Sequence, residues 1–139
     1  MTDAVADDNN AATETPLTDE TELLYRQIPP VWVDDGIPSS QAFVPTKKDS
    51  GKLSIYLGSQ ISPEDAYKHY TTVEGLKSEG SWGISVGELQ QADLNSFPES
   101  LGNNQAHGFI DFRGLGRKQC ERKGKLLVAR ARDRGRLHP

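Results

Sequence analysis

The segment from Arg117 to Arg134 constrains the fold most, because its pattern predicts one long helix with a single apolar side. Placed at 100° per residue, the side chains that this helix would bury fall within an arc of about 100°. They are Cys120, Gly124, Leu127, Val128 and Ala131. Gly135 follows and is suited to end a helix. A stripe of this width is typical of a helix docked on a sheet, so we expect the rest of the chain to supply that sheet.

Four short stretches have the character of strands: residues 23–28, 53–57, 82–86 and 109–112. Within the second, Leu53, Ile55 and Leu57 alternate with polar residues and should share one face. The third alternates large residues with Gly83 and Ser85, so something should approach its small side closely. A second helix is expected from Ser62 to about Val73, and residues 97–107 are expected to form a loop. The predicted fold class is α+β, with a sheet of about four strands, two main helices, and the basic C-terminal helix packed on one face.

The charges are distributed unevenly along the chain. Residues 1–112 hold 18 acidic and 6 basic side chains, whereas residues 113–139 hold 10 basic and 2 acidic ones, for a net charge of −4. Residues 1–20 are acidic and nearly free of large apolar side chains, which predicts a disordered acidic arm before a single domain over residues 21–139. No apolar run approaches the ~18 residues of a membrane span, and no signal-peptide core follows Met1. We therefore expect a cytoplasmic protein without a membrane partner.

The basic surface of the predicted C-terminal helix is the first candidate site. Clustered Lys and Arg side chains attract polyanions by releasing counterions. The residues expected on the exposed arc are Arg117, Lys118, Arg122, Lys125 and Arg132. The leading hypothesis is a small, non-enzymatic interaction module that contacts an anionic partner, either an acidic protein surface or nucleic acid. The alternative is that this face is only solvated, with the acidic part of the chain neutralising it.

A second hypothesis is based on the position of Arg26 in its predicted strand. Strand alternation places it on the same side as Leu24 and Ile28, where an unpaired guanidinium would be costly. A carboxylate from the core, such as Asp111, would satisfy it, and so would an anionic group of a ligand.

The order of motifs around Arg26 resembles the opening of ADP-ribosyltransferase-like folds, and most closely their RES-domain relatives. Leu-Tyr-Arg at 24–26 is followed by Pro-Ser-Ser at 38–40, by Leu-Ser-Ile-Tyr at 53–56, and then by a helix. The resemblance implies a site for NAD in which a strand arginine, a serine and a glutamate surround the dinucleotide. It assigns these roles to Arg26, to Ser39 or Ser40, and to Glu88.

A broader resemblance covers most of residues 23–137. The segments LYRQ, PSSQAFVPTKKDSGKLS, SPEDAYKHY and HGFIDFRGLGRKQ resemble a family of small bacterial proteins of uncharacterised activity. This resemblance implies a bacterial, cytosolic, compact domain and no particular activity. A structural role, or an immunity-type role as the partner of a toxin, is a third alternative.

The histidines and the cysteine predict no further chemistry. The three histidines are scattered and, with one cysteine, have no zinc-binding spacing, so no metal is expected. His69 lies four residues after Asp65 on the predicted helix, which indicates a surface histidine satisfied by contact with Asp65. Cys120 belongs to the buried stripe, where a thiol behaves as a small apolar side chain.

Overall fold

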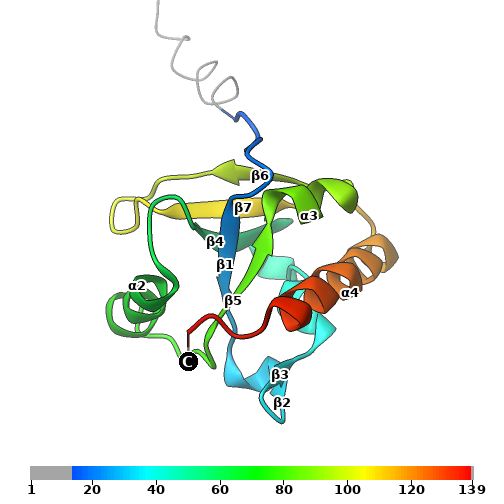
Figure 1. The fold of residues 1–139 in the computed structure, drawn as a ribbon. Helices are drawn as coiled ribbons and strands as arrows, with labels where there is room; N and C mark the ends of the chain where they lie inside the picture. The colour runs from blue at the N-terminus through cyan, green and yellow to red at the C-terminus, as the bar shows by residue number, and fades with distance from the viewer. Residues whose placement is uncertain (1–13, 139) are drawn as a thin grey trace, which may run out of the picture.

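A computed structural model describes residues 14–138. Its centre is an antiparallel sheet of five strands in the order β5-β1-β4-β7-β6 (Figure 1). The strands are β1 (Leu23–Gln27), β4 (Lys52–Leu57), β5 (Ser81–Ser85), β6 (Asn95–Pro98) and β7 (His107–Asp111). The helices are α2 (Pro63–Lys68), which continues as a π-helical turn over His69–Val73, α3 (Val86–Gln91) and α4 (Arg117–Arg134). The predicted α+β class is confirmed.

The long connection between β1 and β4 is built from short elements. A 3₁₀ turn, η1 (Pro30–Trp32), leads into a small hairpin of β2 (Val33–Asp34) and β3 (Ile37–Pro38). Two more 3₁₀ turns follow, η2 (Ser40–Phe43) and η3 (Lys47–Asp49). Ala42 and Phe43 of η2 are fully buried beneath α4, so this connection forms part of the core.

The two faces of the sheet carry different cores. On the first face, Leu53, Ile55 and Leu57 of β4 point into the main core as their alternation predicts, together with Leu24 and Ile84. Helices α3 and α4 cover this face, while α2 lies on the other side of the sheet (Figure 1). On the second face a smaller cluster gathers Tyr25, Tyr56, Ala66 and Ala106.

Helix α4 has the predicted bounds and the predicted buried side. All five residues of its apolar stripe are buried. Gly124 lies at the point of closest approach, because a Cβ there would come within 2.5 Å of the side chain of Val44 and 3.2 Å of the carbonyl oxygen of Ser40. After α4, Gly135 takes a positive φ of 87° and turns the chain toward β5.

The structure differs from the predicted elements at two places. The third predicted strand ends at Ser85, because the Ser85 hydroxyl accepts a hydrogen bond from the Glu88 backbone and the Glu88 carboxylate accepts one from the Ser85 backbone. This capping box starts α3 at Val86. Residues 95–98 form strand β6, at the edge of the sheet, although residues 97–107 were expected to be a loop. The sheet therefore has five strands, and a short edge strand that ends in a proline gives little sequence signal.

The close approach expected beside Gly83 comes from the segment after α4. A Cβ on Gly83 would lie 2.7 Å from a methyl group of Leu137. The backbone of Leu137 donates to the carbonyl of Ser81, and the backbone of Ser81 donates to the carbonyl of His138, both at 2.8 Å. This segment thus pairs with the outer edge of β5 and brings Leu137 to the smaller core on the second face.

Only the last part of the predicted acidic arm, residues 14–20, belongs to the described residues. Residues 1–13 lie outside the described residues. Of the remainder, Leu17 packs against the main core and its backbone donates to the carbonyl of Ser96 in β6 at 2.8 Å. Among the described residues, no helix combines the length and the apolar character needed to cross a bilayer.

Replacing Gly124 by valine should destabilise the protein by about 1–3 kcal/mol, because α4 would have to move away from η2 to make room. Urea denaturation measures the change. The control is Ala129→Val on the exposed side of the same helix, where only helix propensity is lost, at roughly 0.5 kcal/mol. Equal effects of the two substitutions would contradict the close approach at Gly124.

Candidate functional site

The cations of α4 divide into those that the fold uses and those that it leaves exposed. Arg134 forms two hydrogen bonds with the carboxylate of Glu88, at 2.9 and 3.0 Å. Lys123 donates to the carbonyl of Ala92, and Arg130 donates to the side chain of Gln91. These contacts tie one flank of α4 to α3 and to the turn that follows it.

On the other flank, two of the five predicted anion-binding residues have partners within the protein. The Nε of Arg132 donates to the carbonyl of Pro38 at 2.9 Å. Arg117 pairs with Glu121 one turn later, with 3.1 Å between Nε and Oε2, although its side chain is 90% exposed. An exposed pair of this kind contributes little to stability, so Arg117 remains accessible to a partner.

Lys118, Arg122 and Lys125 make up the remainder, and we call them the basic row. They follow one another at intervals of four and three residues, which places them on one side of the helix. All three are exposed. Within residues 14–138, none of them has a carboxylate within ion-pair distance or a side-chain hydrogen bond. The basic row is therefore the concentrated, uncompensated part of the predicted site.

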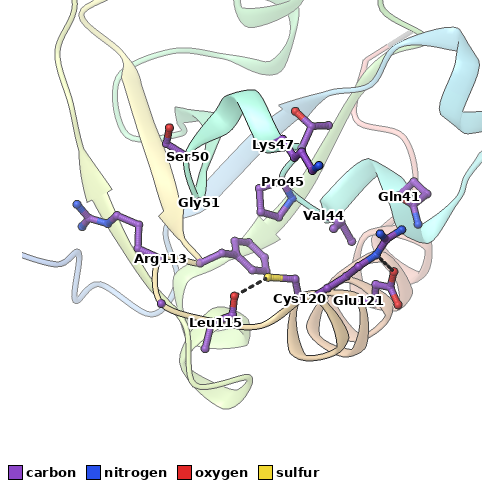
Figure 2. A pocket seen from close by; sticks show the side chains of 14 residues that line it. Gln41, Val44, Pro45, Lys47, Ser50, Gly51, Arg113, Leu115, Cys120 and Glu121 are labelled. Carbon is purple, nitrogen blue, oxygen red and sulfur yellow. Dashed lines mark hydrogen bonds and ion pairs between the residues drawn. The ribbon is translucent and has the colours of Figure 1, made fainter.

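A groove lies beside the first turns of α4 (Figure 2). Its volume is about 560 Å³, and it runs between the segment from Gln41 to Gly51 and the segment from Phe112 to Glu121. Apolar side chains form its walls: Val44, Pro45, Phe112 and Leu115. Charged side chains also line it: Lys47, Arg113, Arg117 and Glu121.

Cys120 lines the inner part of the groove but is not suited to react there. Its side chain is directed toward the carbonyl of Leu115, with 3.9 Å between sulfur and oxygen (Figure 2). Burial raises the pKa of the thiol, so the thiolate is disfavoured. This agrees with the interpretation of Cys120 as a small apolar side chain in the helix stripe.

Arg113 links this groove to the segment that precedes β1. Its guanidinium contacts Asp111 at 2.8 Å and Glu14 at 3.0 Å. Burial alone would raise the pKa of Asp111, but its hydrogen bonds to Arg113 outweigh that effect and lower it. Asp111 is thus the partner of Arg113, and the prediction that it pairs with Arg26 is wrong.

Arg26 is held by carbonyl groups instead of an acid. Its Nε donates to the carbonyl of Ala42 at 2.9 Å and its Nη1 to the carbonyl of Ser54 at 3.0 Å. Among the described residues no carboxylate lies within 4 Å of this guanidinium. Burial lowers the pKa of Arg26, which expresses the cost of keeping a charge there without a counter-ion.

The other residues of the expected NAD site lie in different surroundings. Ser39 precedes η2 and Ser40 begins it, so both lie close in the chain to Ala42, which Arg26 contacts. Glu88 lies in α3, where its carboxylate is engaged by Arg134 and by the backbone of Ser85. Burial alone would raise the pKa of Glu88, but the hydrogen bonds from Arg134 and Ser85 lower it. The structure therefore brings Arg26 near the η2 turn and commits Glu88 to a contact between α3 and α4.

The histidines have partners that sequence spacing did not indicate. His69 contacts the hydroxyl of Tyr56 at 2.8 Å and the carbonyl of Asn103 at 2.7 Å, so the predicted contact with Asp65 is wrong. His107 contacts the hydroxyl of Ser54 at 3.2 Å. The pair of Tyr56 and His69 is separated by 13 residues in the chain, and the pair of Ser54 and His107 by 53. The register of β4 and β7 brings Ser54 and His107 together. No cluster of three or more metal-binding side chains occurs in the part of the chain that the structure describes.

The pair of Glu88 and Arg134 should stabilise the fold at neutral pH and lose this contribution in acid. The lowered pKa of Glu88 means that stability is fully present above its unfolded value, about 4.3, and is lost as pH falls through the folded value. Glu88→Gln should cost roughly 1–3 kcal/mol at pH 7 and less at pH 3. Urea denaturation at both pH values measures this, and Glu121→Gln, which breaks an exposed pair, should cost under about 0.5 kcal/mol. A cost for Glu88→Gln that does not change with pH would contradict the assignment.

Comparisons of the chain with protein-family models, with curated proteins and with solved structures gave no significant match.

Proposed function

We propose that this protein is a binding module for an anionic partner, which it contacts through the basic row of α4 and the adjoining groove. The observation that carries the proposal is the exposed charge of Lys118, Arg122 and Lys125, which has no carboxylate partner within residues 14–138. Elsewhere on the helix, cations are used to fasten α4 to its neighbours.

The energetics of the basic row support a role outside folding. Like charges three or four residues apart on a helix repel each other by about 0.2–0.5 kcal/mol per pair. Lys118 and Arg122 form one such pair, and Arg122 and Lys125 form another. An anionic partner would relieve this repulsion. The row of like charges therefore favours binding, although it does not stabilise the fold.

An acidic protein surface fits this site better than nucleic acid. The apolar walls of the groove, including Val44, Pro45 and Leu115, would accept a side chain from a protein partner, whereas a phosphodiester backbone presents none. The charges of the basic row, at the edge of such an interface, would then set the association rate of the partner and the salt dependence of binding.

The double variant Arg122→Gln/Lys125→Gln should weaken binding of an acidic peptide about tenfold, since two charge contacts at roughly 0.5–1 kcal/mol each are lost. Fluorescence anisotropy with a labelled peptide of alternating Asp, Glu and Leu residues, at about 20–200 mM salt, measures both the affinity and its salt slope. A 20-nucleotide single strand serves as the second probe.

The matched control removes two exposed lysines from the region of α2 and the loop that follows it, Lys68→Gln/Lys77→Gln. It changes the net charge equally and should leave peptide affinity within about twofold. Equal losses in both double variants, or no binding of the peptide at low salt, would overturn the proposal. Tighter binding of the oligonucleotide than of the peptide would replace the acidic protein by nucleic acid.

A further inference from the structure

A serine and a histidine meet on the second face of the sheet, on the opposite side from α4. Ser54 of β4 is paired with Phe109 of β7, and Tyr56 is paired with His107, so Ser54 and His107 are diagonal neighbours across the two strands. The Oγ of Ser54 lies 3.2 Å from the Nε2 of His107. Ser54 is exposed, whereas only 12% of the His107 side chain is.

The hydrogen bonds of His107 determine which ring nitrogen carries the proton. Its Nδ1 lies 2.9 Å from the main-chain carbonyl of Glu99, and a carbonyl can only accept. Nδ1 therefore donates, and Nε2 presents its lone pair to the hydroxyl of Ser54. This is the tautomer that a general base needs in order to take a proton from a serine.

A carboxylate completes the series. The Oε1 of Glu99 lies 3.5 Å from the Nδ1 of His107, where its negative charge would stabilise the imidazolium formed when His107 accepts a proton. The Nζ of Lys52 holds the other oxygen of Glu99 at 3.2 Å. A nucleophile, a base held by the main-chain carbonyl of Glu99, and the carboxylate of the same residue thus follow one another across β4, β7 and the segment after β6.

Arg26 and Lys52 both lie close to the backbone of Ser54. The guanidinium of Arg26 donates to the main-chain carbonyl of Ser54 itself. Within the described residues its Nη2 has no acceptor and the group has no carboxylate partner. Lys52 lies two residues before Ser54 on the same face of β4. Because Lys52 is paired with Glu99, the charge without a carboxylate partner that an anionic substrate group would meet is that of Arg26.

The neighbouring pair of Tyr56 and His69 provides an internal contrast. In this pair, too, one ring nitrogen contacts a hydroxyl and the other contacts a main-chain carbonyl. The Tyr56 hydroxyl contacts Nδ1 of His69, and Nε2 contacts the carbonyl of Asn103. Tyr56 is only 6% exposed, however, and burial strongly raises the pKa of its hydroxyl. That pair is suited to packing, whereas Ser54 is open to solvent.

We propose that Ser54, His107 and Glu99 form an acyl-transfer site that hydrolyses carboxylic esters bearing an anionic group close to the scissile carbonyl. Ser54 is the nucleophile and His107 the general base, while Glu99 is a positioning residue. Arg26 attracts the anionic group. This activity goes beyond the binding function of α4 and departs from the non-enzymatic role expected from the sequence.

The proposed reaction proceeds in two balanced steps. The oxygen of Ser54 bonds to the carbonyl carbon as its proton passes to Nε2 of His107, and the leaving alcohol departs with that proton. The acyl group is then an ester of Ser54. Water attacks this ester with His107 again as base, which releases the carboxylic acid and restores the hydroxyl of Ser54.

A fluorophosphonate probe tests the nucleophile directly, because it forms a stable adduct with activated serines. We expect one adduct per chain, located at Ser54 by peptide mass spectrometry, and none on Ser54→Ala. The control Ser59→Ala removes an exposed serine of the turn after β4 and should label normally. His107→Gln should slow labelling at least about 100-fold, the usual contribution of a general base.

Ester hydrolysis supplies the second readout. The p-nitrophenyl ester of succinate should be cleaved faster than that of acetate, and Arg26→Gln should reduce this preference in a variant that circular dichroism shows folded. Glu99→Gln should lower kcat for the ester at least about tenfold and leave KM within about twofold, because the imidazolium formed in the transition state loses its neighbouring negative charge. A loss of structure in this variant would instead appear in its circular dichroism spectrum.

Three results would overturn the proposal. One is the absence of an adduct on the wild-type protein when circular dichroism shows it folded. Another is an adduct spread over several hydroxyl groups or lysines. The third is labelling of the folded Ser54→Ala variant as fast as the wild-type protein.

Discussion

The contact between α4 and the η2 turn at Gly124 is the constraint on which the rest of the structure depends. Because Gly124 has no side chain there, the helix packs close enough to the sheet to bury Leu127, Val128 and Ala131. Burying such side chains is worth roughly 1–3 kcal/mol each. The same close packing fixes the rotation of α4 about its axis. With that rotation the basic row faces solvent and Arg134 lies beside Glu88.

Arg26 plays a comparable role on the sheet. The ladder between β1 and β4 extends over only two residue pairs, Leu24 with Leu57 and Tyr25 with Tyr56. Beyond these pairs, the guanidinium of Arg26 in β1 donates one hydrogen bond to a carbonyl of β4 and another to a carbonyl of η2. A side chain thus replaces backbone pairing where the strands diverge, which leaves a positive charge close to the exposed part of β4.

Local patterns predicted the parts of the fold that depend on local physics. The bounds of α4, its buried stripe and the inward face of Leu53, Ile55 and Leu57 follow from helix and strand periodicity, and the structure confirms them. The small side of β5 also predicted a close neighbour, though not that Leu137 would be that neighbour.

What the sequence did not predict depends on contacts between distant residues. Strand β6 exists because β7 pairs with it, and α3 begins early because a capping box outweighs the alternation that continues to Val86. For the candidate sites, the exposed arc of α4 was predictable, but which of its cations remain unpaired depends on α3 and β3. The contact between Ser54 and His107 spans 53 residues, and a shift of β7 by one position would turn His107 to the other face.

Both outer strands of the sheet are covered by segments from opposite ends of the described chain. Leu17 donates a backbone hydrogen bond to Ser96 of β6, and Leu137 and His138 exchange hydrogen bonds with Ser81 of β5. An uncovered strand edge offers its backbone groups to any other extended chain, and this is a common route to aggregation. The two peripheral segments occupy these edges at Ser96 and at Ser81, and a fusion partner or purification tag that pulls either segment away would be expected to expose those backbone groups to other chains.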